Sequence, residues 1–202
     1  MTHFNDWQGF VMNVVGILLA AGKGRRFDPT GASDKLLAPL DGEEPVAVAS
    51  ARAMLAVLPH LIAVVPSANG ALAAALRAIG CDVTVCLDAE RGMAASLVHA
   101  LRHSLPDAQA WIIALADMPY VERATIAALR SAVEGGAAIA APVYGGRRGN
   151  PVGFSVAHLA ELLALEGDQG ARALLQAHFV TEVAVHDPGI FQDIDTVADL
   201  AL

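Results

Sequence analysis

Short apolar runs alternate along the chain with longer stretches that have helical spacing. The apolar runs are rich in Val, Ile, Leu and Ala and are expected to be strands: Val14–Ala20, Leu61–Val65, Val83–Leu87, Trp111–Ala116 and Ala137–Ala141. The stretches between them are expected to be helices: Val46–Leu58, Ala71–Ile79, Met93–Leu105 and Glu122–Val133. Apolar strands that alternate with helices are typical of a mostly parallel sheet with helices on both faces. The pattern therefore predicts an α/β fold.

This pattern changes after Pro142. The sequence "YGGRRGNPVGF" is a glycine-rich loop that runs into a short strand. Two helical segments (Val156–Leu163 and Ala171–Phe179) and a strand (Glu182–His186) follow it. We expect this last part of the chain to add to the same sheet, because the sequence shows no linker, repeat or low-complexity tract.

Length and charge limit the classes of protein. A chain of 202 residues suits one α/β domain, so we expect one domain over residues 14–202 after a disordered extension, residues 1–13. The net charge of −8 argues against a nucleic-acid partner, which requires a basic surface. The apolar stretch Val46–Val65 is too interrupted to span a membrane, and the first residues lack the features of a secretory signal. We therefore expect a cytoplasmic protein without a membrane partner.

Two pairs of residues, one of cysteines and one of histidines, are of types that bind metals, but their sequence context does not favour a metal site. Cys81 and Cys86 do not have the spacing of a zinc site or a CxxC motif, so we expect buried free thiols. His99 and His103 have the i, i+4 spacing that can bind zinc. They lie away from the apolar face of their helix, and no HExxH glutamate accompanies them. A solvent-exposed helix face is the better interpretation.

The residues whose types suit ligand binding or catalysis follow predicted strands. Gly22–Arg26 follows the first strand, "ADMP" (Ala116–Pro119) follows the fourth, and "DIDT" (Asp193–Thr196) lies near the end of the chain. Ligands of open parallel sheets bind outside the carboxyl ends of the strands. We therefore expect these three segments to meet at one site.

The first segment, within "GILLAAGKGRRF", combines two glycines with Lys23, Arg25 and Arg26. It matches neither the Walker P-loop nor the GxGxxG dinucleotide motif. One interpretation is a simple turn with solvated charges. The other is a nest of backbone N–H groups that holds a triphosphate. Lys35, which follows closely, either extends its ammonium group to solvent or reaches the α-phosphate.

Acidic residues occupy the other two segments. Asp117 directly follows the apolar run "WIIALA" and is either a helix cap or a magnesium ligand. Asp193 and Asp195 lie two residues apart on an extended segment and so point to one face. Asp195 or Thr196 is also a candidate cap for a final helix. We favour Mg²⁺ as the cofactor, with Asp117 and Asp195 as direct ligands and Asp193 as the second choice.

Two further loops carry charges. "GDQGAR" (Gly167–Arg172) is first interpreted as a helix start with Asp168 as its N-cap, and a second anion site there is the alternative. "RRGNP" (Arg147–Pro151) either has solvated arginines or binds a negatively charged acceptor.

Taken together, "GILLAAGKGRRF…DKLL", "GMAASL", "LADMPYV", "RGNPVGF", "GDQGARALL" and "DIDTVADL" resemble the molybdenum cofactor cytidylyltransferases. The resemblance covers nearly all of residues 14–202. It implies a Rossmann-like three-layer αβα fold, with a mostly parallel sheet and one antiparallel strand. It also implies transfer of CMP from CTP to molybdopterin that carries molybdenum, with release of pyrophosphate. Guanylyl-transferring relatives typically have LAGG where this chain has Leu19–Gly22, which favours CTP.

The resemblance assigns roles to particular residues. The nucleotide-binding set is Leu19, Ala20, Ala21, Gly22, Gly24, Arg25, Lys35 and Ser96. The catalytic set is Lys35, Arg25 and Asp117, and the acceptor-binding set is Arg148, Gly149, Asn150, Asp168 and Arg172. Because the acceptor itself supplies the attacking oxygen, catalysis then consists of positioning and electrostatic stabilisation. A molybdoenzyme or its chaperone is the expected protein partner.

Other functions compete with this interpretation. The nearest is a guanylyltransferase or another nucleotidyltransferase with a different phosphorylated acceptor, such as a sugar phosphate. A dehydrogenase is disfavoured because the third glycine of its motif is missing. A non-catalytic protein that delivers the molybdenum cofactor would hold molybdopterin without turning over CTP.

Overall fold

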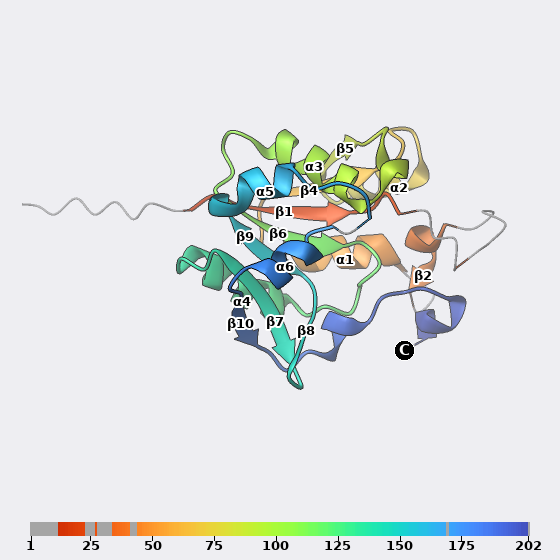
Figure 1. Ribbon diagram of the computed structural model, residues 1–202. Helices are drawn as coiled ribbons and strands as arrows, with labels where there is room; N and C mark the ends of the chain where they lie inside the picture. The colour runs from red at the N-terminus through yellow and green to blue at the C-terminus, as the bar shows by residue number, and fades with distance from the viewer. Residues whose placement is uncertain (1–11, 23–26, 28–33, 41–43, 169, 202) are drawn as a thin grey trace, which may run out of the picture.

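An eight-stranded sheet forms the centre of the molecule (Figure 1). The computed structural model describes residues 12–22, 27, 34–40, 44–168 and 170–201. The strand order is β10-β7-β9-β6-β1-β4-β5, and the short β8 pairs with β7. The strands are β1 (Val14–Leu19), β4 (Leu61–Val65), β5 (Asp82–Val85), β6 (Ala110–Leu115), β7 (Ile139–Tyr144), β8 (Arg147–Arg148), β9 (Val152–Ser155) and β10 (Thr181–Ala184).

Most of these strands run in one direction. β1 is parallel to β4 and β6, β4 is parallel to β5, and β10 is parallel to β7. β9 lies between β6 and β7 and is antiparallel to both, while the two-residue β8 returns against β7. The predicted mostly parallel sheet with one antiparallel strand is confirmed, and the short β8 adds a second antiparallel strand.

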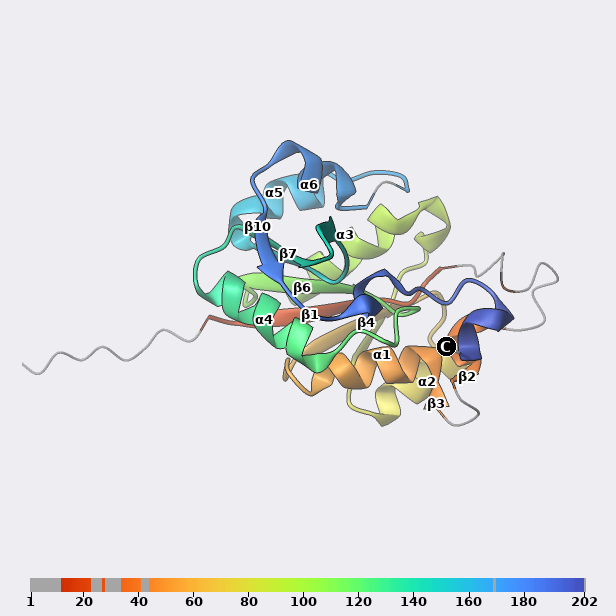
Figure 2. The same cartoon turned by 90° about the horizontal axis from the view of Figure 1, so that it is seen from below.

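Helices cover both faces of the sheet (Figure 2). One side carries α1 (Val46–Leu55), α2 (Ala71–Ala78) and α4 (Arg123–Glu134), and the other carries α3 (Met93–Ser104), α5 (Leu159–Leu163) and α6 (Arg172–Ala177). Side chains alternate between the two cores, because successive residues of a strand point to opposite faces. On β6, Ile112 packs toward α4 whereas the fully buried Trp111 packs toward α3. The predicted three-layer αβα architecture is confirmed.

Short elements complete the described chain. They are the 3₁₀ turns η1 (Lys35–Leu37), η2 (Ala89–Arg91), η3 (Val156–His158), η4 (Pro188–Phe191) and η5 (Val197–Ala201), and a small hairpin of β2 (Pro39–Leu40) and β3 (Glu44–Pro45). The helices α1, α2 and α3 end one to three residues earlier than the apolar spacing suggests, whereas α4 ends one residue later. For example, α1 stops at Leu55, and a turn places the fully buried Leu58 in the core ahead of β4.

Both cysteines are buried and free, as expected from their spacing. Burial raises the pKa of the Cys81 thiol to about 11, so this group stays protonated and unreactive near neutral pH. Among the described residues no helix is long and apolar enough to cross a bilayer. Most of the expected N-terminal extension, residues 1–11, lies outside the described part of the chain.

Candidate active site

A buried lysine joins two acidic residues that are far apart in the sequence. Lys35 is the first residue of η1, and Asp34 fixes this turn by accepting a 2.9 Å hydrogen bond from the Leu36 amide. The Lys35 Nζ atom lies 2.6 Å from Asp117 Oδ2 and 3.7 Å from Asp195 Oδ1. Its side chain is only 10% exposed, so this charge faces the two carboxylates rather than bulk solvent. The structure thus brings together three residues of the predicted site.

Backbone contacts hold the C-terminal segment against the end of β6. The Ile194 amide donates to the Asp117 carbonyl at 2.8 Å, and Lys35 Nζ donates to the Ile194 carbonyl at 3.1 Å. Ile194 is fully buried and anchors the segment, whereas the neighbouring Asp193 is exposed. Asp195, which is 25% exposed, is therefore held beside the lysine by the burial of Ile194.

The final helical segment, η5, begins at Val197, directly after Thr196, one of the two residues expected to cap it. The side chain of Asp199 fixes the residues that lead into this segment. Asp199 Oδ2 accepts from the Asp195 amide at 3.0 Å, from the Thr196 amide at 2.7 Å and from Thr196 Oγ1 at 2.9 Å. These hydrogen bonds, those from Thr196 first, hold the pKa of the Asp199 carboxyl below its ordinary value. The Asp195 carboxylate lies beside Lys35, with Oδ1 3.7 Å from Nζ.

A first hollow of about 460 Å³ opens at the carboxyl ends of β1 and β6. Its lining includes six residues of the predicted site, namely Leu19, Ala21, Gly22, Ser96, Asp117 and Asp168. Ala20 is buried beneath them, and its amide donates to the Val64 carbonyl. The predicted residues Gly24 and Arg25, together with Lys23 and Arg26, lie outside the described residues. The glycine loop that was expected to hold the triphosphate is thus described only up to Gly22.

A second hollow of about 570 Å³ adjoins the first. All five predicted acceptor residues line it: Arg148, Gly149, Asn150, Asp168 and Arg172. The two hollows share Leu19, Met93, Leu115 and Asp168, so they form one continuous cleft. The sequence-predicted nucleotide and acceptor residues therefore lie in neighbouring compartments of a single cleft.

The arginine loop is attached to other parts of the structure. Arg148 donates from Nε to Glu182 Oε1 at 2.9 Å, and its Nη2 lies 2.8 Å from the same oxygen. The guanidinium group of Arg147 lies over the Phe191 ring, 4.5 Å from its centre. Arg148 is 43% exposed and lines the second hollow. Of the two arginines, only Arg148 is a lining residue of that hollow.

The expected N-cap role of Asp168 is wrong. α6 begins at Arg172 after Ala171, so Asp168 lies too far before the helix to reach its first amides. The loop instead packs against Gly92, where an added Cβ would lie 2.5 Å from both Asp168 Oδ1 and the Gly167 carbonyl oxygen. The Gly167 carbonyl accepts from the Ala94 amide at the start of α3. This close approach places Asp168 at the junction of the two hollows.

Comparison with known proteins shows the family to which this chain belongs. Residues 16–183 match the family described as the MobA-like NTP transferase domain. The chain belongs to this family. It is 30% identical over 198 residues to the purine catabolism protein PucB of Bacillus subtilis (strain 168), a match that covers 91% of this chain and 92% of PucB.

Solved structures agree with this assignment. Rv0371c from Mycobacterium tuberculosis H37Rv has a TM-score of 0.79 and 31% identity, over 93% of this chain and 95% of that chain. A structure described as the complex of Rv0371c with manganese has a TM-score of 0.75 and 29% identity, over 93% and 96% of the two chains. The predicted relation to the molybdopterin nucleotidyltransferases is confirmed at the level of this family, and the chain is a nucleotidyltransferase.

One residue that supports the loop with Gly149 and Asn150 in this MobA-like protein carries no obvious sequence signal of function. Asp187 is only 2% exposed, and its Oδ2 accepts from the Glu122 amide at 2.9 Å and from Thr125 Oγ1 at 2.7 Å. Its Oδ1 accepts from the Gly189 amide at 2.8 Å. The sequence "DPG" at this point indicates a turn but not these distant partners.

Asp187 fixes the segment that supports this loop. The Ile190 carbonyl, three residues further on, accepts from the Asn150 amide at 3.0 Å. Gly149 lies so close to Ile190 that an added Cβ would be 2.5 Å from the Ile190 carbonyl oxygen. The glycine of "RGNP" is therefore required by the fold of this loop.

We expect Asp187→Asn to lower the free energy of unfolding by about 2 kcal/mol, because a buried charged acceptor of three hydrogen bonds loses its charge and one acceptor oxygen. Urea denaturation followed by circular dichroism measures this. The exposed Asp107 gives a matched control, and Asp107→Asn should change the free energy by no more than about 0.5 kcal/mol. Equal unfolding midpoints for Asp187→Asn and the wild type would contradict the assigned role.

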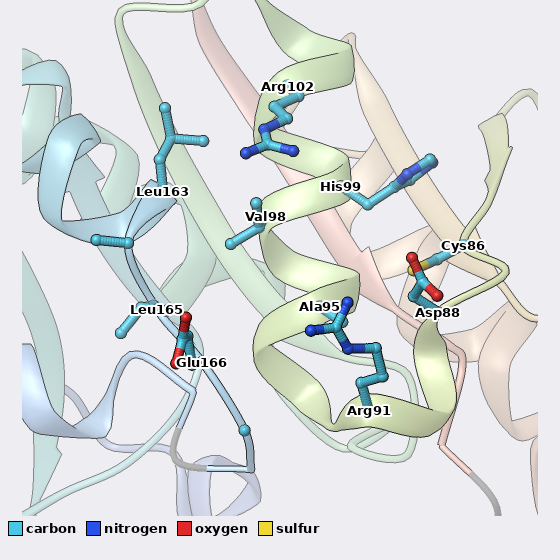
Figure 3. Close-up of a pocket in the computed structure, with 12 residues that line it drawn as sticks. Cys86, Asp88, Arg91, Ala95, Val98, His99, Arg102, Leu163, Leu165 and Glu166 are labelled. Carbon is cyan, nitrogen blue, oxygen red and sulfur yellow. The ribbon is translucent and has the colours of Figure 1, made fainter.

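A third hollow, of about 440 Å³, lies on the outer side of α3 (Figure 3). Arg91, Val98 and Arg102 line one side of it, and the segment Leu163–Gly167 lines the other. None of the sequence-predicted site residues line this hollow. It is therefore separate from the first and second hollows.

His99 and His103 bind to β5 rather than to a common ligand. His99 Nε2 lies 2.8 Å from Thr84 Oγ1, and His103 Nε2 lies 2.8 Å from Asp82 Oδ2. Burial, and then the charge of His103, lower the pKa of His99. Each ring contacts a different residue of β5, so the two histidines link α3 to this edge strand.

Proposed function

We propose that this nucleotidyltransferase transfers CMP from CTP to the terminal phosphate of molybdopterin that carries molybdenum. The observation that carries the proposal is the continuous cleft. Its first compartment, at the end of β1, ends at Asp117, and its second is lined by Arg148 and Arg172. A nucleotide in the first compartment and an anionic acceptor in the second would meet beside the lysine–carboxylate cluster.

The reaction needs no protein nucleophile. A terminal phosphate oxygen of the acceptor forms a bond to the α-phosphorus of CTP, the bond from that phosphorus to the bridging oxygen breaks, and pyrophosphate leaves. The protein contributes positioning and charge. We assign the β- and γ-phosphates to the glycine loop with Gly22, Gly24 and Arg25, and the charge that develops on the α-phosphate to Lys35.

The donor set fits a hard divalent cation. Asp117 and Asp195 converge on one positive charge, the Lys35 ammonium, so the fold already brings two carboxylates within reach of a common cation. Magnesium usually takes one or two protein carboxylates and fills its remaining positions with water and phosphate oxygens. We assign Asp117 and Asp195 as its ligands, with Asp193 in the outer shell. When bound, Mg²⁺ would neutralise phosphate charge as a Lewis acid.

The choice of nucleotide rests on Ala21, which lines the first compartment where guanylyl-transferring relatives typically have glycine. The added methyl group narrows the space for a purine. The choice of acceptor rests on the resemblance of the "RGNP" and "GDQGAR" loops to the molybdenum cofactor cytidylyltransferases, and both loops line the second compartment.

Pyrophosphate release with each of the four nucleotides, with and without molybdopterin, tests the proposal. We expect release that requires both CTP and molybdopterin. Preference for GTP would make the protein a guanylyltransferase, and release with a sugar phosphate instead of molybdopterin would assign another acceptor. Molybdopterin binding without any turnover would identify a non-catalytic delivery protein.

Arg148→Ala is expected to raise KM for the acceptor about tenfold, because a charged hydrogen bond is lost, and to leave KM for CTP nearly unchanged. Steady-state kinetics with each substrate varied in turn measures the two values. Glu182→Gln, which releases Arg148 from its ion pair, serves as the control and should keep the acceptor KM near that of the wild type. An equal rise of both KM values in Arg148→Ala would move this loop to the nucleotide side.

A further inference from the structure

Two histidines and a glutamate converge on the outer surface, away from the cleft. His158 is the last residue of η3, Glu161 lies in α5, and His178 directly follows α6. His158 Nδ1 lies 2.9 Å from Glu161 Oε1, and His178 Nε2 lies 2.7 Å from Glu161 Oε2. The two rings are 4.5 Å apart at their centres. None of these residues line the two compartments of the cleft.

We infer that His158, Glu161 and His178 form a binding site for a divalent transition metal such as Zn²⁺. The donors are two imidazole nitrogens and a carboxylate, a set that zinc commonly binds. One ligand atom from each residue lies within 4.8 Å of the other two. Ligand atoms of a tetrahedral zinc site are about 3.3 Å apart, given bonds of about 2.0–2.1 Å. Small side-chain rotations would therefore close the site.

The surroundings orient the ligands without blocking access. The His158 side chain is only 12% exposed and meets the edge of the Phe154 ring at 6.3 Å, so the protein core sets its position. The side chains of His178 and Glu161 are 33% and 45% exposed, which leaves an approach from solvent. Hydrogen bonds from His158, and then from His178, hold the pKa of the Glu161 carboxyl below its ordinary value.

The location gives the metal a structural effect. Glu161 and His158 come from one helical segment, with the i, i+3 spacing that places side chains together on a helix face. His178 comes from the end of α6, and the opposite end of that short helix, Arg172, lines the second hollow. A bound metal would tie α6 to α5.

Zinc titration of the EDTA-treated full chain by calorimetry, with millimolar Mg²⁺ present to compete at carboxylate-only sites, tests the inference. We expect one Zn²⁺ per chain in the wild type and affinity at least ~10–100-fold weaker in both His178→Ala and Glu161→Gln. Co²⁺ should give a visible absorption band that both variants lose. Circular dichroism shows that each variant is folded, and Glu161→Gln preserves the shape of the side chain.

Two matched variants show where the metal binds. His103→Ala removes a histidine that pairs with a single carboxylate at a similar distance, and Asp117→Asn removes a carboxylate of the cleft. Both should bind one Zn²⁺ with wild-type affinity. The inference is overturned if the wild type binds no stoichiometric Zn²⁺, or if His178→Ala and Glu161→Gln bind it as tightly as the wild type. Because calorimetry does not measure turnover, its result is independent of the proposed reaction.

Discussion

Asp117→Asn is expected to lower turnover at least ~10²-fold while KM for CTP changes much less. The substitution keeps the shape of the side chain but removes the charge that lies 2.6 Å from Lys35 and that we assign to the catalytic metal. Loss of metal-based stabilisation of the transition state costs several kcal/mol, which corresponds to a rate loss of this size. Pyrophosphate release at saturating CTP and acceptor, measured over a Mg²⁺ titration, gives the effect.

Asp193→Asn is the matched control, because Asp193 is an exposed acid two residues before Asp195. We expect its turnover to fall less than ~10-fold, as suits an outer-shell residue. The fold of Asp117→Asn should survive, since the residue lies at a strand end and its carbonyl still accepts from Ile194. A near wild-type rate for Asp117→Asn, or wild-type activity that persists in EDTA, would contradict the metal assignment.

Lys35→Met should also lower turnover at least ~10²-fold, and it should change how the protein responds to metal. The variant loses the proposed stabilisation of the α-phosphate. It also leaves Asp117 and Asp195 facing each other without the ammonium that now lies between them. Because a divalent cation would relieve this repulsion, we expect Mg²⁺ to raise Tm more in Lys35→Met than in the wild type.

Thermal unfolding with and without Mg²⁺ measures this difference without any substrate. Arg52→Met is the control, since Arg52 forms an exposed ion pair with Glu44 outside the cleft, and its Tm should respond to Mg²⁺ as the wild type does. If Mg²⁺ raises Tm equally in Lys35→Met and in the wild type, the ammonium and the metal do not share these carboxylates. Substantial turnover by Lys35→Met would remove Lys35 from catalysis.

Local patterns predicted the fold because the core strands are continuous apolar runs. β1 and β6, for example, are buried on both faces and end abruptly at the residues that line the cleft. A strand end is a local signal, and the parallel topology then brings different strand ends to one edge. The placement of Asp117 and Gly22 in one hollow was therefore predictable from the sequence.

Contacts between loops were not predictable in this way, because no periodicity relates their residues. The burial of Ile194 brings Asp195 to Lys35. The loop with Asp168 packs against Gly92, and this contact was not visible in the sequence. The contacts of Asp187 and His178 were likewise not predictable, because their partners are distant in the sequence. The i, i+3 spacing relates His158 to Glu161, but His178 joins them only through tertiary packing.

The polar residues of the two compartments come largely from different parts of the chain, so they can change separately during evolution. The polar lining found only in the second compartment comes from a late stretch of the chain, between Arg148 and Gln176, whereas Lys35 and Asp117 precede it. β9 joins that late stretch to the sheet through an antiparallel pairing that leaves the parallel strands in place. On the proposed assignment of the two compartments, substitutions in that stretch would change the acceptor while the chemistry on the nucleotide stays the same. Proteins with this architecture would then differ in the molecule they modify and share the reaction.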